Sequence, residues 1–122
     1  MPIQELHDVR MLVCKDQGAA LESERDANVL MSAAWEHGAS MVVLPVTRLT
    51  DDFFRLSTRV AGAITQKFAN CNLRLAVVGD ISRWVAASKS LHDFVYEANR
   101  GHSIWFVENM DDLERRLVRR AA

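Results

Sequence analysis

Prolines and cysteines are scarce in this chain, which has two of each among its 122 residues. Cys14 and Cys71 do not form a Cys-x-x-Cys pair, and two cysteines are too few for a disulfide framework. No apolar run approaches the roughly 20 residues of a membrane-spanning helix, and the N-terminal segment lacks the basic and apolar regions of a signal peptide. We therefore expect a cytoplasmic protein with reduced thiols and no membrane partner.

Neither sign of charge is in excess. The chain has 15 Lys and Arg against 16 Asp and Glu, which gives a formal net charge of −1. Such a balance creates no general field to attract nucleic acid. The one basic cluster is typical of a helix C-terminus whose cations face the negative end of the helix dipole, and it consists of Arg115, Arg116, Arg119 and Arg120. We expect no nucleic-acid partner.

Motifs for phosphate loops, dinucleotide binding, zinc proteases, nucleophile elbows and calcium loops are absent from the sequence. None of the four histidines has a ligand partner three or four residues further along the chain, so we expect no metal and no other cofactor. Cys14 lies in an apolar run and is expected to be an inert core thiol. Cys71, between two asparagines, is expected to be exposed and unactivated.

Short apolar runs of strand length are present instead, and their continuous hydrophobicity is typical of strands buried on both faces. They cover residues 9–14, 41–46, 73–78 and 104–107. Residues 3–6 are expected to pair with residues 9–14 as a hairpin, although the intervening His7 and Asp8 include no glycine, which two-residue turns favour.

Helical patterns alternate with these runs. Residues 26–37 are expected to form an amphipathic helix that ends before Gly38. Its expected inward face is Val29, Leu30, Ala33 and Ala34, which His37 could extend. Another helix begins with a capping-box-like Ser90 and runs to about residue 99, and a loop with Trp84 precedes it. A last helix is capped by Asn109. This order predicts an α/β domain spanning residues 1–122, with a mixed, largely parallel sheet of about four or five strands and about four helices.

The segment from residue 50 to 70 is expected to be one helix capped by Thr50. Its inward stripe is Phe53, Leu56, Val60, Ile64 and Phe68. Gly62 lowers the stability of such a helix by about 1 kcal/mol relative to alanine. This predicts a close approach there by the sheet, by a neighbouring helix or by a second subunit. Arg59, Gly62 and Gln66 are the candidate contacts with a second subunit.

Ser57 and Thr58 follow Arg55 and are candidate phosphoacceptors. The alternative for Ser57 is a hydroxyl that only bonds back to the helix backbone.

Ligands of parallel sheets favour the crevice beyond the carboxyl ends of the strands. Polar residues expected there are Thr47, Arg48, Asp80, Ser82, Glu108 and Asn109. The stretch Ser88, Lys89 and Ser90 adds a lysine and a helix N-terminus that could hold an anion. Glu97 and Asn99, near the end of the following helix, are further candidate ligand contacts. The alternative is that all these residues cap helices and brace loops.

Three segments are distinctive and occur in a fixed order. They are DDFFRLSTRVAGAITQKFAN, LRLAVVGDIS and SKSLHDFVYEANRGHSIWFV. Together they resemble a bacterial family, domain-of-unknown-function family 4180, over roughly residues 27–107. The residues that match its motifs are Phe53, Phe54, Leu56, Ala61, Gly62, Gln66, Lys67, Phe68, Gly79, Asp80, Ser88, Lys89, Ser90, Leu91, Phe94, Glu97, Asn99 and Gly101. Three residues depart from the pattern: Arg59 replaces the usual glycine, Ala63 a frequent glutamate and Cys71 a frequent aromatic residue.

The family has no established activity, so the resemblance implies a fold more than a function. That fold is similar to the sulfate-transporter and anti-sigma-antagonist (STAS) domains, which are α/β switch and interaction modules. In those domains a phosphorylatable serine lies at the start of a helix. Ser57 and Thr58 resemble that serine only in part.

Two functions follow as hypotheses. The first is a non-enzymatic, STAS-like regulatory or protein-interaction domain that associates with itself. The alternative is a protein or enzyme that binds a small anionic metabolite in the crevice near Asp80 and Ser88–Ser90.

Overall fold

The protein contains one five-stranded sheet in the order β1-β2-β3-β4-β5. The structure is a computed structural model that describes the backbone of residues 3–121 and the side chains of residues 3–118, so the side chains of Arg119 and Arg120 lie outside the described residues. The strands are β1 (Ile3–Leu6), β2 (Val9–Val13), β3 (Met41–Pro45), β4 (Arg74–Val78) and β5 (Ile104–Val107). β1 is antiparallel to β2, and the other pairs are parallel. The predicted α/β class and the mixed, mostly parallel sheet are confirmed.

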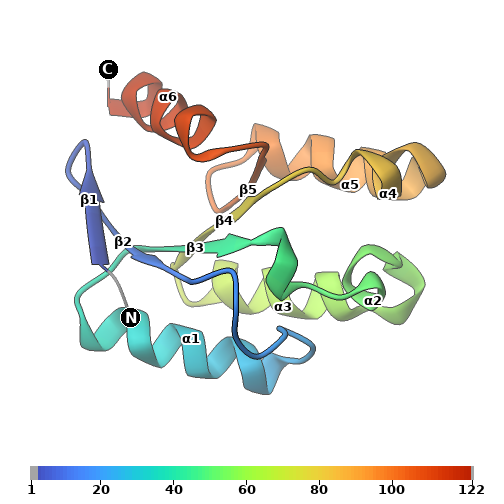
Figure 1. Ribbon diagram of the computed structural model, residues 1–122, viewed down its shortest axis with the longest axis horizontal. Coiled ribbons are helices and arrows are strands. Elements are labelled where there is room, and N and C mark those ends of the chain that lie inside the picture. The colour runs from blue at the N-terminus through green and yellow to red at the C-terminus, as the bar shows by residue number, and fades with distance from the viewer. Residues whose placement is uncertain (1–2, 122) are drawn as a thin grey trace.

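The helices lie on the two faces of this sheet (Figure 1). They are α1 (Glu24–Glu36), α2 (Asp51–Phe54), α3 (Val60–Asn70), α4 (Ser82–Ala87), α5 (Lys89–Arg100) and α6 (Met110–Ala121), with 3₁₀ turns η1 (Val46–Arg48) and η2 (Leu56–Thr58). The four helices α1, α3, α5 and α6 are the long ones. Consecutive parallel strands are neighbours, and right-handed crossovers then place the intervening helices on one face.

Alternate strand residues build two cores. Leu12, Val42 and Leu75 pack in the larger core with residues of α1, α3 and α5. Met11, Met41 and the other residues of the second face pack with Leu113 and Leu117 of α6. All these strand residues are buried, at most 8% exposed, which explains why the strands read as continuous apolar runs rather than as alternating ones.

The β1–β2 hairpin forms without a glycine in its turn. His7 and Asp8 have φ angles of 49° and 68°, the left-handed values that a type I′ turn requires of both central residues. Aspartate is among the residues that tolerate this region. The pairing that the apolar pattern predicted therefore prevails over the unfavourable turn sequence.

The prediction of a single helix over residues 50–70 is wrong. The chain instead forms α2, η2 and then α3. Arg55 is extended between α2 and η2, with φ −93° and ψ 101°, and Arg59 is left-handed before α3, with φ 66° and ψ 6°. Thr50 occupies the N-cap position of α2 but makes no side-chain cap bond. Phe53, Ile64 and Phe68 are nevertheless all buried, because the break preserves the direction in which the stripe faces.

Three smaller expectations also need correction. Val29 is 62% exposed, since the inward face of α1 is Ala27, Leu30, Met31 and Ala34. Trp84 lies within α4, where a loop was expected. The cap of α5 is Ser88, whose hydroxyl accepts a hydrogen bond from the Leu91 backbone at 3.2 Å, so the helix begins two residues before the expected position.

The conformation of Arg59 explains why a glycine suits this position, because a left-handed backbone costs other residues about 1–2 kcal/mol. We predict that the free energy of unfolding of Arg59→Gly is about 1 kcal/mol higher than that of Arg59→Ala, a variant that also removes the arginine side chain. Urea unfolding measures the difference. At Arg55, where φ is −93°, the matched Gly and Ala variants should show the opposite order; the same order at both positions would contradict this explanation.

Candidate functional site

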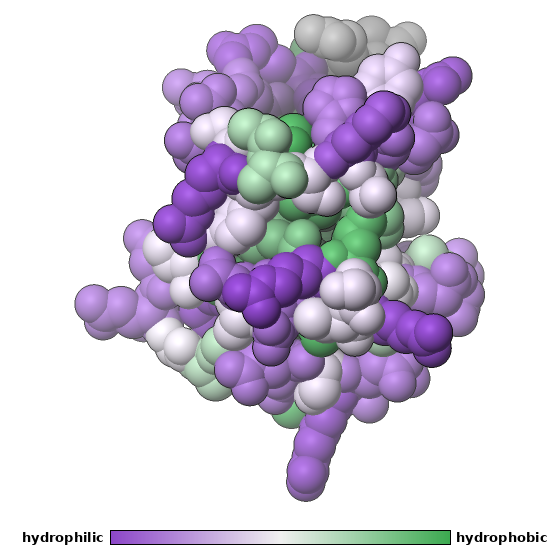
Figure 2. Space-filling view, turned by 90° about the vertical axis from the view of Figure 1, so that its right-hand side faces the viewer, coloured by the Kyte–Doolittle hydropathy of each residue, from purple (hydrophilic) through white to green (hydrophobic). Residues whose placement is uncertain are grey.

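The carboxyl ends of β2, β3, β4 and β5 meet at one edge of the sheet, which points to the right in Figure 1. Figure 2 looks onto this side and shows hydrophobic surface gathered at its centre with hydrophilic residues around it. Two separate hollows open at this edge, one beyond β4 and β5 and one beyond β2 and β3.

Asp80 and Ser82 line the hollow beyond β4 and β5, which has a volume of about 310 Å³. The backbone N–H of Ser82 donates to Asp80 Oδ1 at 2.9 Å, and hydrogen bonds from Ser82 lower the pKa of the exposed Asp80 carboxyl. Gly79 has φ +145°, and a Cβ there would lie 2.7 Å from Val46 Cγ2. The Gly79–Asp80 motif therefore makes a tight turn that begins α4.

Lys89 and its neighbours do not converge on that hollow. The Lys89 ammonium pairs with Asp93 one turn along α5 at 3.1 Å, and hydrogen bonds from Lys89 and then His92 lower the pKa of Asp93. Ser88 uses its hydroxyl as the α5 cap. The predicted anion-binding stretch thus begins α5 with an ion-paired lysine.

Ser90 and Glu97 line a different hollow, of about 570 Å³, which we call the α3–α5 groove. Its other lining residues are Thr65, Asp93, Phe94, Ala98, Gly101, His102, Ser103 and Ile104. The groove lies beside the start of β5, away from the carboxyl ends of the strands. The structure therefore divides the ligand-contact set that the sequence suggested.

Asn99 braces three elements of the fold. Its Oδ1 accepts from the Phe106 backbone N–H of β5 at 2.7 Å and from Arg116 of α6 at 3.3 Å, and its backbone oxygen accepts from Arg116 at 2.5 Å. The Arg116 guanidinium also lies over the Trp105 ring, 4.3 Å from its centroid. Asn99 is thus a structural residue that joins α5, β5 and α6, which the alternative interpretation had anticipated.

The two hydroxyls proposed as phosphoacceptors differ in their surroundings. Thr58 Oγ1 can donate to the carbonyl oxygens of Asp52 at 2.5 Å and Arg55 at 2.8 Å, and it accepts from the Val60 backbone at 3.3 Å. Ser57 is exposed at the tip of η2.

Arg59, Gly62 and Gln66 all lie on the exposed side of α3. A Cβ added to Gly62 would meet no atom within 4 Å. Gln66 donates to Asn70 Oδ1 at 2.7 Å. Neither the sheet nor a neighbouring helix approaches Gly62 closely in the described part of the chain, which removes two of the three reasons that the sequence offered for this glycine.

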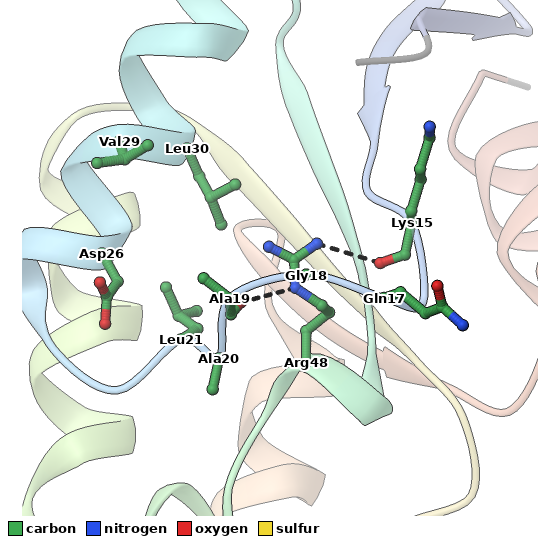
Figure 3. A pocket seen from close by; sticks show the side chains of 10 residues that line it. All are labelled: Lys15, Gln17, Gly18, Ala19, Ala20, Leu21, Asp26, Val29, Leu30 and Arg48. Carbon is green, nitrogen blue, oxygen red and sulfur yellow. Dashed lines mark hydrogen bonds between the residues drawn. The ribbon is translucent and has the colours of Figure 1, made fainter.

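The hollow beyond β2 and β3, which we call the Arg48 pocket, has a volume of about 470 Å³ (Figure 3). Thr47 and Arg48 were expected at this edge, but the loop of residues 15–20 that encloses the pocket was not. Thr47 Oγ1 donates to the Asp16 backbone oxygen at 3.0 Å, and Arg48 Nε donates to that of Ala19 at 2.7 Å. No residue spacing in the sequence signals that these carbonyl groups converge on one arginine.

The two cysteines and the metal ligands can also be placed. Cys14 is buried, and desolvation raises the pKa of its thiol although nearby Arg48 acts in the opposite direction. Cys71 is half-buried and packs against the larger core, where an exposed thiol was expected. Within residues 3–118 no three His, Cys, Asp or Glu side chains are grouped to hold a metal ion. No helix in the described part of the chain could cross a membrane.

The protein is thus an α/β domain with two hollows at the carboxyl ends of its parallel strands. The chain belongs to the family described as Domain of unknown function (DUF4180), whose model matches residues 6–117. Comparisons with curated proteins and with solved structures find no match.

If Asn99 braces the fold, its removal should leave the Phe106 N–H without an acceptor. We predict that Asn99→Ala lowers the free energy of unfolding by about 1–3 kcal/mol, whereas Asn99→Asp, which keeps the acceptor, loses less. Urea unfolding of both variants measures this, with Asn28→Ala on the exposed side of α1 as control. Equal losses for Asn99→Ala and Asn28→Ala would contradict the bracing role.

Proposed function

We propose that this protein is a non-enzymatic, STAS-like regulatory module that binds protein surfaces, including a second copy of itself through the exposed side of α3. The observation that carries the proposal is the open space around Gly62. A glycine inside a helix costs about 1 kcal/mol relative to alanine, and within the described chain no close contact explains it. A neighbouring subunit that lies against the bare backbone would do so.

The surroundings of Gly62 suit such a contact. Thr65, one turn further along α3, faces the α3–α5 groove, whose walls include Phe94, Ala98 and Ile104. The apolar side chains among its lining residues offer a docking partner surface to bury, and the polar ones offer hydrogen bonds. The exposed Arg59 and Gln66 provide hydrogen-bond donors beside it, as the polar rim of an interface does.

The proposal predicts that the purified protein is a dimer and that Gly62→Leu is a monomer, because four added carbons would separate the two backbones. Sedimentation equilibrium measures the association. Gly62→Ala, which adds one methyl group in open space, should raise monomer stability by up to about 1 kcal/mol. Glu114→Leu on α6, on the other face of the sheet, is the matched control and should remain dimeric.

A wild-type protein that stays monomeric at all accessible concentrations would overturn the self-association. So would a Gly62→Leu dimer as tight as the wild type.

The regulatory part of the proposal assigns phosphorylation to Ser57 rather than to Thr58. Ser57 is exposed, whereas the Thr58 hydroxyl is bonded to the turn that precedes α3. A phosphate on Thr58 would have to break those bonds, while one on Ser57 would extend into solvent close to the positive end of α3.

Intact-mass and fragment spectrometry of the protein purified from its native host should therefore place a phosphate on Ser57 and leave Thr58 unmodified. Ser57→Ala should abolish the modified species and keep the unfolding midpoint. Phosphate on Thr58 alone, or no modified species under any growth condition, would contradict the assignment.

The alternative function, binding of an anionic metabolite near Asp80 and Ser88–Ser90, has less support. Its residues line different hollows, and its lysine is paired with Asp93.

A further inference from the structure

The Arg48 pocket combines a fixed guanidinium with an apolar wall, and neither feature is needed for the α3 surface. The pocket lies beyond the carboxyl ends of β2 and β3, where ligands of parallel sheets characteristically bind. Its volume of about 470 Å³ lies within the roughly 300–1,000 Å³ typical of small-molecule sites.

Arg48 is held by the loop that crosses it. Nε donates to the Ala19 backbone oxygen at 2.7 Å, and Nη1 donates to that of Lys15 at 3.1 Å. Gly18 has φ +152°, and a Cβ at this position would lie 2.8 Å from Arg48 Cζ. Any residue larger than glycine would press on the guanidinium. The loop therefore fits around Arg48 and fixes its direction.

These two bonds use two of the five N–H donors of the guanidinium. Within the described chain, Nη2 has no protein acceptor. In Figure 3 the terminal nitrogen that is not bonded to Lys15 lies on the side of Leu30, across the pocket from the Lys15 oxygen. A half-buried arginine with N–H groups directed into a hollow is suited to a carboxylate, which it can bind through two parallel hydrogen bonds.

The opposite wall is apolar. Val29 and Leu30 of α1 line the pocket together with Ala19, Ala20 and Leu21. Val29 is 62% exposed, because it lies on the pocket side of α1 rather than on its core face. A hydrocarbon group placed there would bury the Val29 surface that the fold leaves in water, next to the edge of Leu30, which is only 4% exposed.

The charges of the lining favour one negative group on the ligand. The Lys15 side chain points away from Arg48 (Figure 3) but belongs to the lining and adds positive charge at the rim. The Asp26 carboxylate is occupied near the start of α1, where it accepts from the Glu22 backbone at 2.9 Å. A second negative group close to Asp26 would be repelled.

We propose that the Arg48 pocket binds a small aliphatic monocarboxylate, with its carboxylate on Arg48 and its hydrocarbon chain against Val29 and Leu30. This proposal is independent of the α3 contact, which lies on another helix.

Hexanoate is the probe, titrated into the ¹⁵N-labelled full-length protein and followed by amide chemical shifts. We expect saturable shifts confined to residues 15–21, 26–30 and 48–49, with a dissociation constant of about 1 mM or lower. Inorganic phosphate tests the anion without a hydrocarbon chain, and hexylamine tests the chain without the anion. For both, the dissociation constant obtained from the shifts of these residues should be at least about tenfold higher than for hexanoate.

Val29 offers a matched pair of variants at an exposed position that the fold does not need. Val29→Glu should weaken hexanoate binding at least about tenfold, because a carboxylate replaces the apolar contact, whereas Val29→Lys should bind within about threefold of the wild type. Arg48→Lys should no longer bind hexanoate, since an ammonium group cannot make the two parallel hydrogen bonds that a guanidinium makes with a carboxylate. If that variant unfolds, the Val29 pair still decides.

The proposal is overturned if hexanoate causes no saturable shifts or shifts residues elsewhere. It is also overturned if phosphate or hexylamine binds as tightly, or if the two Val29 variants bind alike.

Discussion

The side-by-side order of four parallel strands is the constraint on which the rest of the molecule depends. Because β2, β3, β4 and β5 are consecutive in both sequence and space, their crossover helices collect on one face, and their carboxyl ends collect at one edge. Among the described helices, α6 alone then covers the other face, which it does with Leu113 and Leu117. The loops that follow these four strands therefore all begin at the same edge of the sheet.

Backbone conformation, more than side-chain chemistry, shapes the loops at that edge. Gly79 lets the chain pass close to Val46 after β4, and Gly18 lets it close over Arg48 after β2. Arg59 makes a comparable left-handed turn without the freedom of a glycine. The two glycines thus permit close approaches, whereas Gly62 permits none within the chain. A Cβ added to Gly62 would meet no atom within 4 Å, so no close contact in the described chain explains that glycine.

Local patterns in the sequence were sufficient to predict the strands. A strand buried on both faces is a continuous apolar run, and residues 41–46 and 104–107 could be recognised without knowing their neighbours. The helix break at Arg59 could not be predicted from apolar spacing, which is the same on both sides of a single left-handed residue; the glycine that the family usually has at this position was the signal that could have indicated it. The sequence likewise does not indicate that the backbone oxygens of Lys15 and Ala19 converge on Arg48.

The candidate site shows the same limit. Asn99 is polar and near a helix end, features shared by ligand contacts and by braces. Only the positions of Phe106 and Arg116 decide between them. Glu97, two residues earlier, faces the α3–α5 groove instead. Residues close in sequence therefore separate in space: Asp80 and Ser82 line one hollow and Ser90 and Glu97 another, whereas Lys89 lines neither.

Preorganisation is the physical reason for proposing an anion site at Arg48 and not at Lys89. Lys89 has an 88% exposed side chain paired with Asp93, so an incoming anion would have to compete with a carboxylate and order a flexible chain in water. Arg48 is already fixed by two backbone oxygens, which carry no net charge and leave its own charge uncompensated. A ligand there gains a charge-assisted hydrogen bond without the entropy loss of ordering its partner. The anion site that we propose therefore lies at the loop that follows β2, and not at the start of α5.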